Sequence, residues 1–283
     1  MNKIGLLCEG GGTKGAYTSG VLQCFLDNDI IFPYCVGISA GAVNLMPYVS
    51  RQPERLRVTG VDSASQKGAI GIIPLLREGG IFGIHQTYNY IEKHAPLNYE
   101  KFHNSSTKFD IGIYNLDTNL VEYKDSSEFT LEKPELIKAS CALLMLARPV
   151  KINDTKYMDA GLIDMIPIEQ SIRAGNTKHV FISTKEENYI RKPAPTWQMR
   201  LSRFLFPRNK QIAEDLKIRH ENYAKQWNII KELEKENKVL VLRPSMDMGI
   251  TRTTQDKDKL DKWYDLGYQD TLDRLDLIRE FIK

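Results

Sequence analysis

The sequence contains no apolar run long enough to cross a lipid bilayer. Its two longest candidates, residues 69–76 and 139–147, fall far short of the roughly 18 residues that a membrane-spanning helix requires. It also has little excess charge, since 39 Lys and Arg oppose 36 Asp and Glu for a formal net charge of +3, which gives no reason to expect a nucleic-acid partner. These absences, with a hydrophobic fraction of 42%, predict a globular, cytoplasmic protein of the size of an enzyme.

Cysteine is scarce as well. Cys8, Cys24, Cys35 and Cys141 show no C-x-x-C spacing and no neighbouring histidine cluster, so neither a metal site nor a disulfide framework is predicted. We therefore expect a protein from a reducing compartment that holds no metal and no other cofactor.

Strand-like and helix-like segments alternate along the chain. Short apolar runs that end at glycine loops predict buried strands, and apolar residues at helical spacing predict the helices between them. The expected strands are 4–8, 34–38, 109–114, 120–124, 150–152, 156–158, 179–183 and 239–243. The expected helices are 14–28, 40–50, 134–146, 167–174, 211–237 and 254–283. Buried strands that alternate with helices predict an α/β fold with a mostly parallel sheet covered on both faces.

The composition changes near Asn188. Residues 190–210 contain three prolines, six basic residues and no acidic residue, and a long helical pattern follows them. We predict a catalytic core at 1–188, a basic helical cap or lid at 189–237, and a strand and helix at 238–283 that complete the same domain.

A glycine-rich loop follows the first predicted strand. Gly10, Gly11, Gly12 and Gly15 lie in the sequence GGGTKG, which literally satisfies the G-x-G-x-x-G fingerprint of dinucleotide-binding proteins. That fingerprint also requires an acidic residue about 20 positions further on, where this chain has Cys35. A phosphate-binding P-loop is excluded too, because no Lys-Ser/Thr pair follows the glycines. What remains is a loop at a helix N-terminus whose backbone can approach a ligand and favour an anion.

The second motif, Gly37-Ile38-Ser39-Ala40-Gly41, lies between a predicted strand and a predicted helix. A G-x-S-x-G sequence in that context forms a sharp turn that raises the serine hydroxyl above the sheet edge. The motif alone is common, but the expected strand and helix on either side favour Ser39 as a nucleophile.

A serine hydroxyl needs a base to take its proton. Every histidine of the chain follows Ser39, none lies in a loop with a catalytic signature, and we interpret them all as surface or structural residues: His85, His94, His103, His179 and His220. Asp159 is the best-placed alternative base, because it follows a short strand at a turn of small residues. Glu9 and Asp164 are the competing carboxylates, and we interpret both as hydrogen-bonding or surface residues.

In this order, the glycine loop, the G-x-S-x-G turn and Asp159-Ala160-Gly161 resemble the patatin-like phospholipase family over about 150 residues. The sequence ASCA at 139–142 and Pro149 are similar to that family's approach to its acid. Arg243-Pro244 and the helix around Tyr268 resemble the bacterial branch of stand-alone members.

The resemblance implies a three-layer α/β/α sandwich and a metal-independent serine acyl hydrolase. It implies a dyad of Ser39 as nucleophile and Asp159 as general base, which acts through an acyl-enzyme on lipid or other acyl esters. The backbone of Gly10, Gly11 and Gly12 would supply the oxyanion hole, and Gly37 and Gly41 would shape the turn at the nucleophile.

Three points stay open at this stage. The family usually has glycine where this chain has Ala160, so a catalytically weak or inactive scaffold with the same fold is one alternative. A dinucleotide-binding oxidoreductase is a second, less favoured one. Lys14 either contacts a phosphate or fatty carboxylate or simply faces solvent.

The basic segment 190–210 interleaves its six cations with Trp197, Met199, Leu201 and three residues at 204–206. This pattern is typical of a cap that contacts the surface of an anionic membrane without crossing it. The alternative is a lid helix that packs its apolar residues on the domain. We therefore expect a cytoplasmic protein, and the first interpretation adds a peripheral contact with a membrane.

Overall fold

The computed structural model describes residues 3–283. A central sheet has the strand order β5-β6-β3-β2-β1-β7-β8, and β4 pairs with β3 outside that path. The bounds are β1 Ile4–Cys8, β2 Tyr34–Ile38, β3 Lys108–Asn115, β4 Leu120–Asp125, β5 Val150–Ile152, β6 Thr155–Asp159, β7 Lys178–Ile182 and β8 Val239–Leu242. The pairings from β3 through β2, β1 and β7 to β8 are parallel, whereas those of β4, β5 and β6 are antiparallel.

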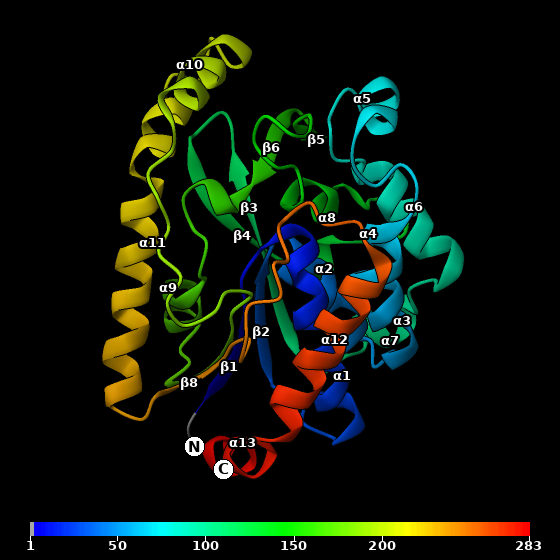
Figure 1. The fold of residues 1–283 in the computed structure, drawn as a ribbon, viewed down its shortest axis with the longest axis vertical. Coiled ribbons are helices and arrows are strands. Elements are labelled where there is room, and N and C mark those ends of the chain that lie inside the picture. The colour runs from blue at the N-terminus through cyan, green and yellow to red at the C-terminus, as the bar shows by residue number, and fades with distance from the viewer. Residues whose placement is uncertain (1–2) are drawn as a thin grey trace.

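Helices cover both faces of this sheet (Figure 1). The longer ones are α1 Gly15–Asp27, α2 Ala40–Val49, α6 Ile84–His94, α10 Thr196–Leu205, α11 Gln211–Lys235, α12 Lys257–Leu272 and α13 Leu275–Ile282. The shorter ones are α3 Pro53–Arg57, α4 Ser63–Ser65, α5 Ile72–Glu78, α7 Tyr99–His103, α8 Glu135–Ser140 and α9 Ile168–Arg173. Three short 3-10 helices are η1 Gly12–Lys14, η3 Ser126–Glu128 and η4 Ala160–Leu162. The segment η2 Val58–Asp62 is a π-helix.

Alternate residues of the buried strands face two separate cores. In β1, Leu6 and Cys8 pack with α1, α2 and α12, whereas Leu7 packs with the residues of α9 and α11 on the other face. In Figure 1 α1, α2 and α12 lie on one side of the sheet and α9 and α11 on the other. The predicted three-layer α/β/α sandwich with a mostly parallel central sheet is confirmed.

The observed elements differ from the expected ones in three places. The helix expected at 134–146 ends at Ser140, because the Ser140 hydroxyl donates to the Gly112 carbonyl and the chain then turns through Met145 at a φ of +64°. The helix expected at 254–283 is two helices, since Arg274 leaves helical geometry and donates to the Val241 carbonyl. Residues 53–103, for which no helix was expected, form α3 to α7.

Two observations bear on the remaining expectations. No helix within residues 3–283 combines the length and the apolarity needed to cross a bilayer. The division into 1–188, 189–237 and 238–283 stays a prediction, although β8 from the last part is hydrogen-bonded into the same sheet as β7.

Candidate active site

The register of the sheet brings Ser39 and Asp159 together across 120 positions of sequence. In β3, Gly112 pairs with Ile38 at the end of β2, and the next residue, Ile113, pairs with Asp159 at the end of β6. The two strands therefore meet end to end along one edge of β3. Both side chains are buried, with exposed fractions of 5% for Ser39 and 4% for Asp159.

Ser39 has the backbone geometry of a sharp strand-to-helix turn. Its φ of 56° and ψ of −130° lie in a region that side-chain-bearing residues rarely occupy. The turn is locked on both sides, because a Cβ at Gly37 would overlap the Ala42 backbone and one at Gly41 would overlap the carbonyl oxygens of Cys8 and Glu9.

The backbone of this turn is anchored from behind by Ser140. The Ser39 N–H donates to Ser140 Oγ at 3.0 Å, and Ser140 Oγ donates in turn to the Gly112 carbonyl at 2.8 Å. These bonds occupy the Ser39 amide and leave its side-chain hydroxyl free for the site. Ser140 belongs to the ASCA sequence at 139–142, which resembles a family motif. That resemblance gave no role for Ser140.

Asp159 presents one free carboxylate oxygen to the site. Its Oδ1 accepts from the Gly161 N–H at 2.7 Å, whereas its Oδ2 is buried and accepts no hydrogen bond of ordinary geometry within residues 3–283. Burial raises the pKa of Asp159, and the nearby Ser39 side chain, the Gly161 amide and the guanidinium groups of Arg219 and Arg252 oppose that rise. A raised pKa with a free oxygen toward a serine suits a general base.

Ala160 fits its position without strain. It begins the 3-10 turn η4, where φ is negative, and it is not among the residues with positive φ. The turn after Asp159 therefore does not require glycine, so the conformational reason for expecting a weakened dyad is wrong.

The glycine loop leaves backbone donors free beside Ser39. The Thr13 N–H donates to the Arg252 carbonyl and the Lys14 N–H to the Gly11 carbonyl, but no acceptor within the described part of the chain takes the N–H of Gly11 or Gly12. The loop can approach closely only because it lacks side chains. A Cβ at Gly10 would lie 2.8 Å from Ser39 Cβ, and Gly12 has a φ of +57°.

Lys185 and Glu9 form a buried ion pair that contacts the glycine loop. Lys185 was not predicted from the sequence. Lys185 Nζ lies 3.0 Å from Glu9 Oε2 and donates to the Gly10 carbonyl at 3.1 Å and to Thr184 Oγ1 at 2.8 Å. Burial is the main cause that lowers the pKa of Lys185 to about 8, against the opposing Glu9 charge. Glu9 also accepts from Ser183 and Thr184, so its carboxylate serves the loop rather than Ser39.

The other candidate acid–base residues lie elsewhere. Asp164 accepts from the Tyr123 hydroxyl and from Gln226, and burial raises its pKa to about 6. Burial lowers the pKa of His179 to about 4, and its ring bonds to Ser171 Oγ. The residues that line the two cavities next to Ser39 include no histidine, which agrees with the structural interpretation of His179 and the other four.

Ser39 lies on the border between two cavities of opposite character. One is apolar and extends over α2, α4 and α6; its walls include Val43, Ala64, Ile84, Ile91 and Leu143. The other contains the glycine loop and Asp159, and its walls include Lys14, Lys185, Arg191, Arg219 and Arg252. Lys14 therefore lies at the site and does not simply face solvent; its Nζ is 3.9 Å from Glu186 Oε2.

The basic segment 190–210 reaches these cavities through a single residue. Arg191 lines the cationic cavity, whereas residues 192–210 line neither cavity. Met199 and Phe206 pack on a small core with Leu162 and Leu216. The helix α10 therefore packs on this small core, and its role as a cap or lid stays a prediction.

Comparisons with known proteins identify the family of the chain. A family model described as patatin-like phospholipase matches residues 6–172, which is 167 of the 283 residues and includes Ser39 and Asp159. This chain belongs to the patatin-like phospholipase family. A second model, described as a domain of unknown function (DUF6363), matches residues 209–283. Family membership favours lipid hydrolysis over the dinucleotide-dependent chemistry that the glycine loop also allowed.

Two known proteins extend the comparison, one by its sequence and one by its fold. The uncharacterized protein YjjU of Escherichia coli K12 is 26% identical over 225 residues, which are 77% of this chain and 62% of that protein. The chain thus spans about three fifths of that relative's length. VipD from Legionella pneumophila has a similar fold, with a TM-score of 0.51 at 14% identity over 98% of this chain and 67% of VipD.

Proposed function

We propose that this protein is a serine acyl hydrolase that cleaves lipid esters with a Ser39–Asp159 dyad. The observation that carries the proposal is the strained Ser39 turn placed beside a buried carboxylate with one oxygen free. The family to which the chain belongs and the apolar cavity next to Ser39 support an acyl chain as part of the substrate.

The first half of the reaction forms an acyl-enzyme. Asp159 takes the proton of Ser39 Oγ while that oxygen attacks the ester carbonyl carbon, and the carbonyl electron pair moves onto oxygen. The N–H groups of Gly11 and Gly12, which lack other acceptors, stabilise this oxyanion; removal of one such donor costs about 10²–10³ in rate. When the tetrahedral intermediate collapses, the alcohol leaves with the proton from Asp159.

The second half releases the acid. Asp159 takes a proton from water, the hydroxide oxygen attacks the acyl carbon, and Ser39 Oγ leaves and regains its proton. Since Asp159 must be ionised to begin each half, its raised pKa sets the acid limit of activity. Ser140 holds the Ser39 backbone in the reactive turn throughout.

The test is hydrolysis of p-nitrophenyl butyrate by the wild type, Ser39→Ala and Asp159→Asn. The proposal predicts turnover by the wild type and losses of at least about 10³ in kcat for both variants. Equal activity of Ser39→Ala and wild type would show that another residue is the nucleophile. Full activity of Asp159→Asn would show that Asp159 is not the general base, while the assignment of Ser39 as the nucleophile would stand.

A membrane contact through 190–210 is the second part of the proposal. In α10, the exposed fractions are 59% for Trp197 and 79% for Phe204, beside several cations of that segment. The helix α5 lies at the same end of the molecule (Figure 1) and leaves Ile72 and Leu76 exposed at 65% and 79%. Exposed apolar residues next to basic ones are typical of proteins that lie on anionic lipid.

Liposome flotation tests this contact. Replacement of Arg200, Arg203 and Arg208 by Glu is expected to abolish flotation with vesicles that contain phosphatidylglycerol. Replacement of Trp197 and Phe204 by Ser is expected to weaken it at every salt concentration, because apolar burial is not screened. Unchanged flotation of both variants would overturn the membrane contact.

A further inference from the structure

The cationic cavity next to Ser39 contains more positive charge than its own carboxylates can balance. Its walls include five basic side chains, namely Lys14, Lys185, Arg191, Arg219 and Arg252, and only two acidic ones, Glu9 and Asp159. Lys185 is paired with Glu9, and Lys14 faces Glu186. Three arginines are left, which we call the arginine cluster: Arg191, Arg219 and Arg252.

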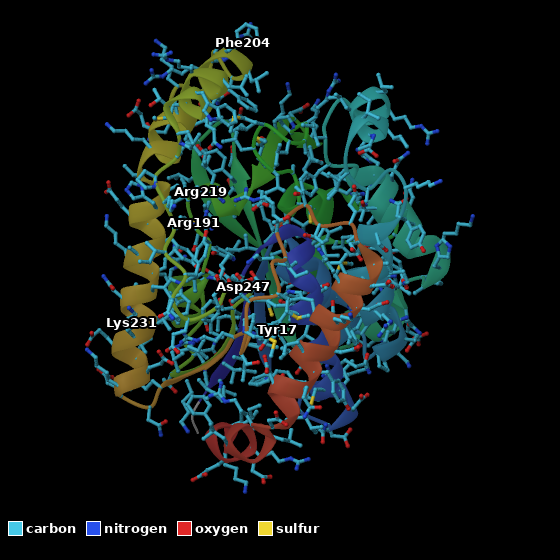
Figure 2. The ribbon with its side chains drawn as sticks, viewed as in Figure 1. Tyr17, Arg191, Phe204, Arg219, Lys231 and Asp247 are labelled. Carbon is cyan, nitrogen blue, oxygen red and sulfur yellow. The ribbon has the colours of Figure 1, made fainter. Side chains whose placement is uncertain are left out.

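Three separate segments supply the arginine cluster. Arg191 follows β7, Arg219 lies on α11, and Arg252 lies in the loop before α12. Within residues 3–283 none of the three lies within ion-pair distance of a carboxylate. In Figure 2 Arg191 and Arg219 lie close to each other between α11 and the sheet, whereas Lys231 lies further down α11.

Contacts hold the side chains of two of the arginines and the backbone of the third, and they leave guanidinium donors free. Arg219 Nε donates to the Gly161 carbonyl at 2.7 Å, and its other guanidinium nitrogens have no acceptor within the described residues. Arg191 lies over the Tyr223 ring at 4.8 Å. The backbone of Arg252 is held through its carbonyl, which accepts from the Thr13 N–H, and its exposed side chain extends into the cavity wall. The cluster is therefore positioned without an anion from the protein to complete it.

Like charges this close oppose one another. Burial and the charges of Arg191 and Arg252 lower the pKa of Arg219 to about 9, and Asp159 opposes them only in part. A bound anion removes that repulsion, and planar guanidinium groups match the oxygens of a phosphoryl group in pairs. Three guanidinium groups from three directions suit a group with several charged oxygens.

We propose that the arginine cluster binds the phosphoryl group of the acyl ester whose carbonyl lies at Ser39, with the acyl chain in the apolar cavity. The inference rests on the proposed function and adds the substrate's head group to it. The cluster also disfavours a cationic substituent on the phosphate. Glu9 is already paired, and Arg191 occupies the Tyr189 and Tyr223 rings that could otherwise receive a quaternary ammonium. The preferred substrate is thus an acyl ester with an anionic phosphate head group.

The experiment compares three monoacyl substrates with the same acyl chain below their micelle concentrations: monoacylglycerol phosphate, monoacylglycerophosphocholine and monoacylglycerol. The wild type is expected to favour the first by at least about tenfold in kcat/KM.

Arg252→Gln is the main variant, because it retains the backbone carbonyl that accepts from the Thr13 N–H. Arg219→Gln is the second variant. For both variants, kcat/KM on the phosphate substrate is expected to fall by about tenfold to a hundredfold relative to kcat/KM on p-nitrophenyl butyrate, measured with the same variant at about pH 8. Lys231→Gln, further along α11, is the matched control with no loss.

Several results would overturn the inference. Equal kcat/KM for the three lipids would do so, and so would equal losses of the arginine variants on lipid and p-nitrophenyl ester. Inhibition by inorganic phosphate that is lost in Arg252→Gln, without any preference among lipids, would assign the cluster to free phosphate instead. If the wild type hydrolyses no ester, the proposed function fails on its own. Calorimetric titration of Ser39→Ala with monoacylglycerol phosphate and monoacylglycerol then still decides whether the cluster binds the phosphate.

Discussion

Lys185 Nζ lies 3.0 Å from Glu9 Oε2 in a buried ion pair beneath the glycine loop. Removal of one partner of such a pair leaves an uncompensated charge, so Lys185→Met is expected to lower the free energy of unfolding by about 3–5 kcal/mol. The double variant Glu9→Gln with Lys185→Met is expected to lose less than the single one. Chemical denaturation measures both.

The exposed pair of Lys235 and Glu232, 2.7 Å apart on α11, is the matched control. Lys235→Met is expected to cost less than about 1 kcal/mol, because solvent screens that pair. A cost for Lys185→Met as small as that of Lys235→Met would contradict the role given to the buried pair.

The strained backbone at Ser39 is expected to lower the free energy of unfolding of the protein. Glycine adopts positive φ at little cost, so Ser39→Gly is expected to be more stable to denaturation than Ser39→Ala by about 1 kcal/mol. Both variants are expected to be inactive. Ser50 has an ordinary φ of −82° and supplies the control. Ser50→Gly is expected to be no more stable than Ser50→Ala. A Ser39→Gly protein no more stable than Ser39→Ala would show that the turn is unstrained.

The pH dependence of ester hydrolysis is expected to report Asp159. Arg219 lowers the pKa of this carboxyl group, so Arg219→Gln removes a charge that favours the ionised form and raises the pKa further. Activity requires ionised Asp159, and the acid limb of kcat/KM for p-nitrophenyl butyrate is therefore expected to move to higher pH by up to about one unit. Lys231→Gln should leave the limb in place, and a limb that moves to lower pH in Arg219→Gln would refute the assignment.

The apolar cavity predicts how acyl-chain length is selected. Ala64 lines this cavity on α4, and Ala64→Phe is expected to fill part of it. The ratio of kcat/KM for p-nitrophenyl dodecanoate to that for p-nitrophenyl butyrate should fall about tenfold, since each buried CH₂ contributes about 0.8 kcal/mol. An unchanged ratio would place the acyl chain elsewhere.

The local parts of this site could be predicted from the sequence, because each is a short motif with its own geometry. The Gly37–Ser39–Gly41 spacing dictates the turn at the nucleophile, and Gly10 to Gly12 dictate a bare backbone loop. Asp159 could be selected as the best-placed carboxylate because it follows a short strand at a turn of small residues, and the resemblance to a family motif supplied its role as general base. What joins it to Ser39 is the register of β3, and a register is not a property of either motif.

The remaining parts of the site depend on contacts between distant segments. Lys185, Arg219 and Arg252 follow no motif, and they meet only because the residues after β7, the first half of α11 and the loop before α12 line one cavity. Many of the wall residues of the apolar cavity come from residues 53–103, for which no helix was expected. The basic segment 190–210 was the most visible feature of composition, yet it supplies only Arg191 to the site.

The most direct test of the central claim is labelling with a fluorophosphonate probe, with the modified peptide located by mass spectrometry. The account predicts one adduct, on the peptide that contains Ser39. It also predicts that the labelling rate of Asp159→Asn falls by at least about 10², because the hydroxyl then lacks its base. An adduct on another residue, or Ser39 labelled equally fast in Asp159→Asn, would contradict the Ser39–Asp159 dyad.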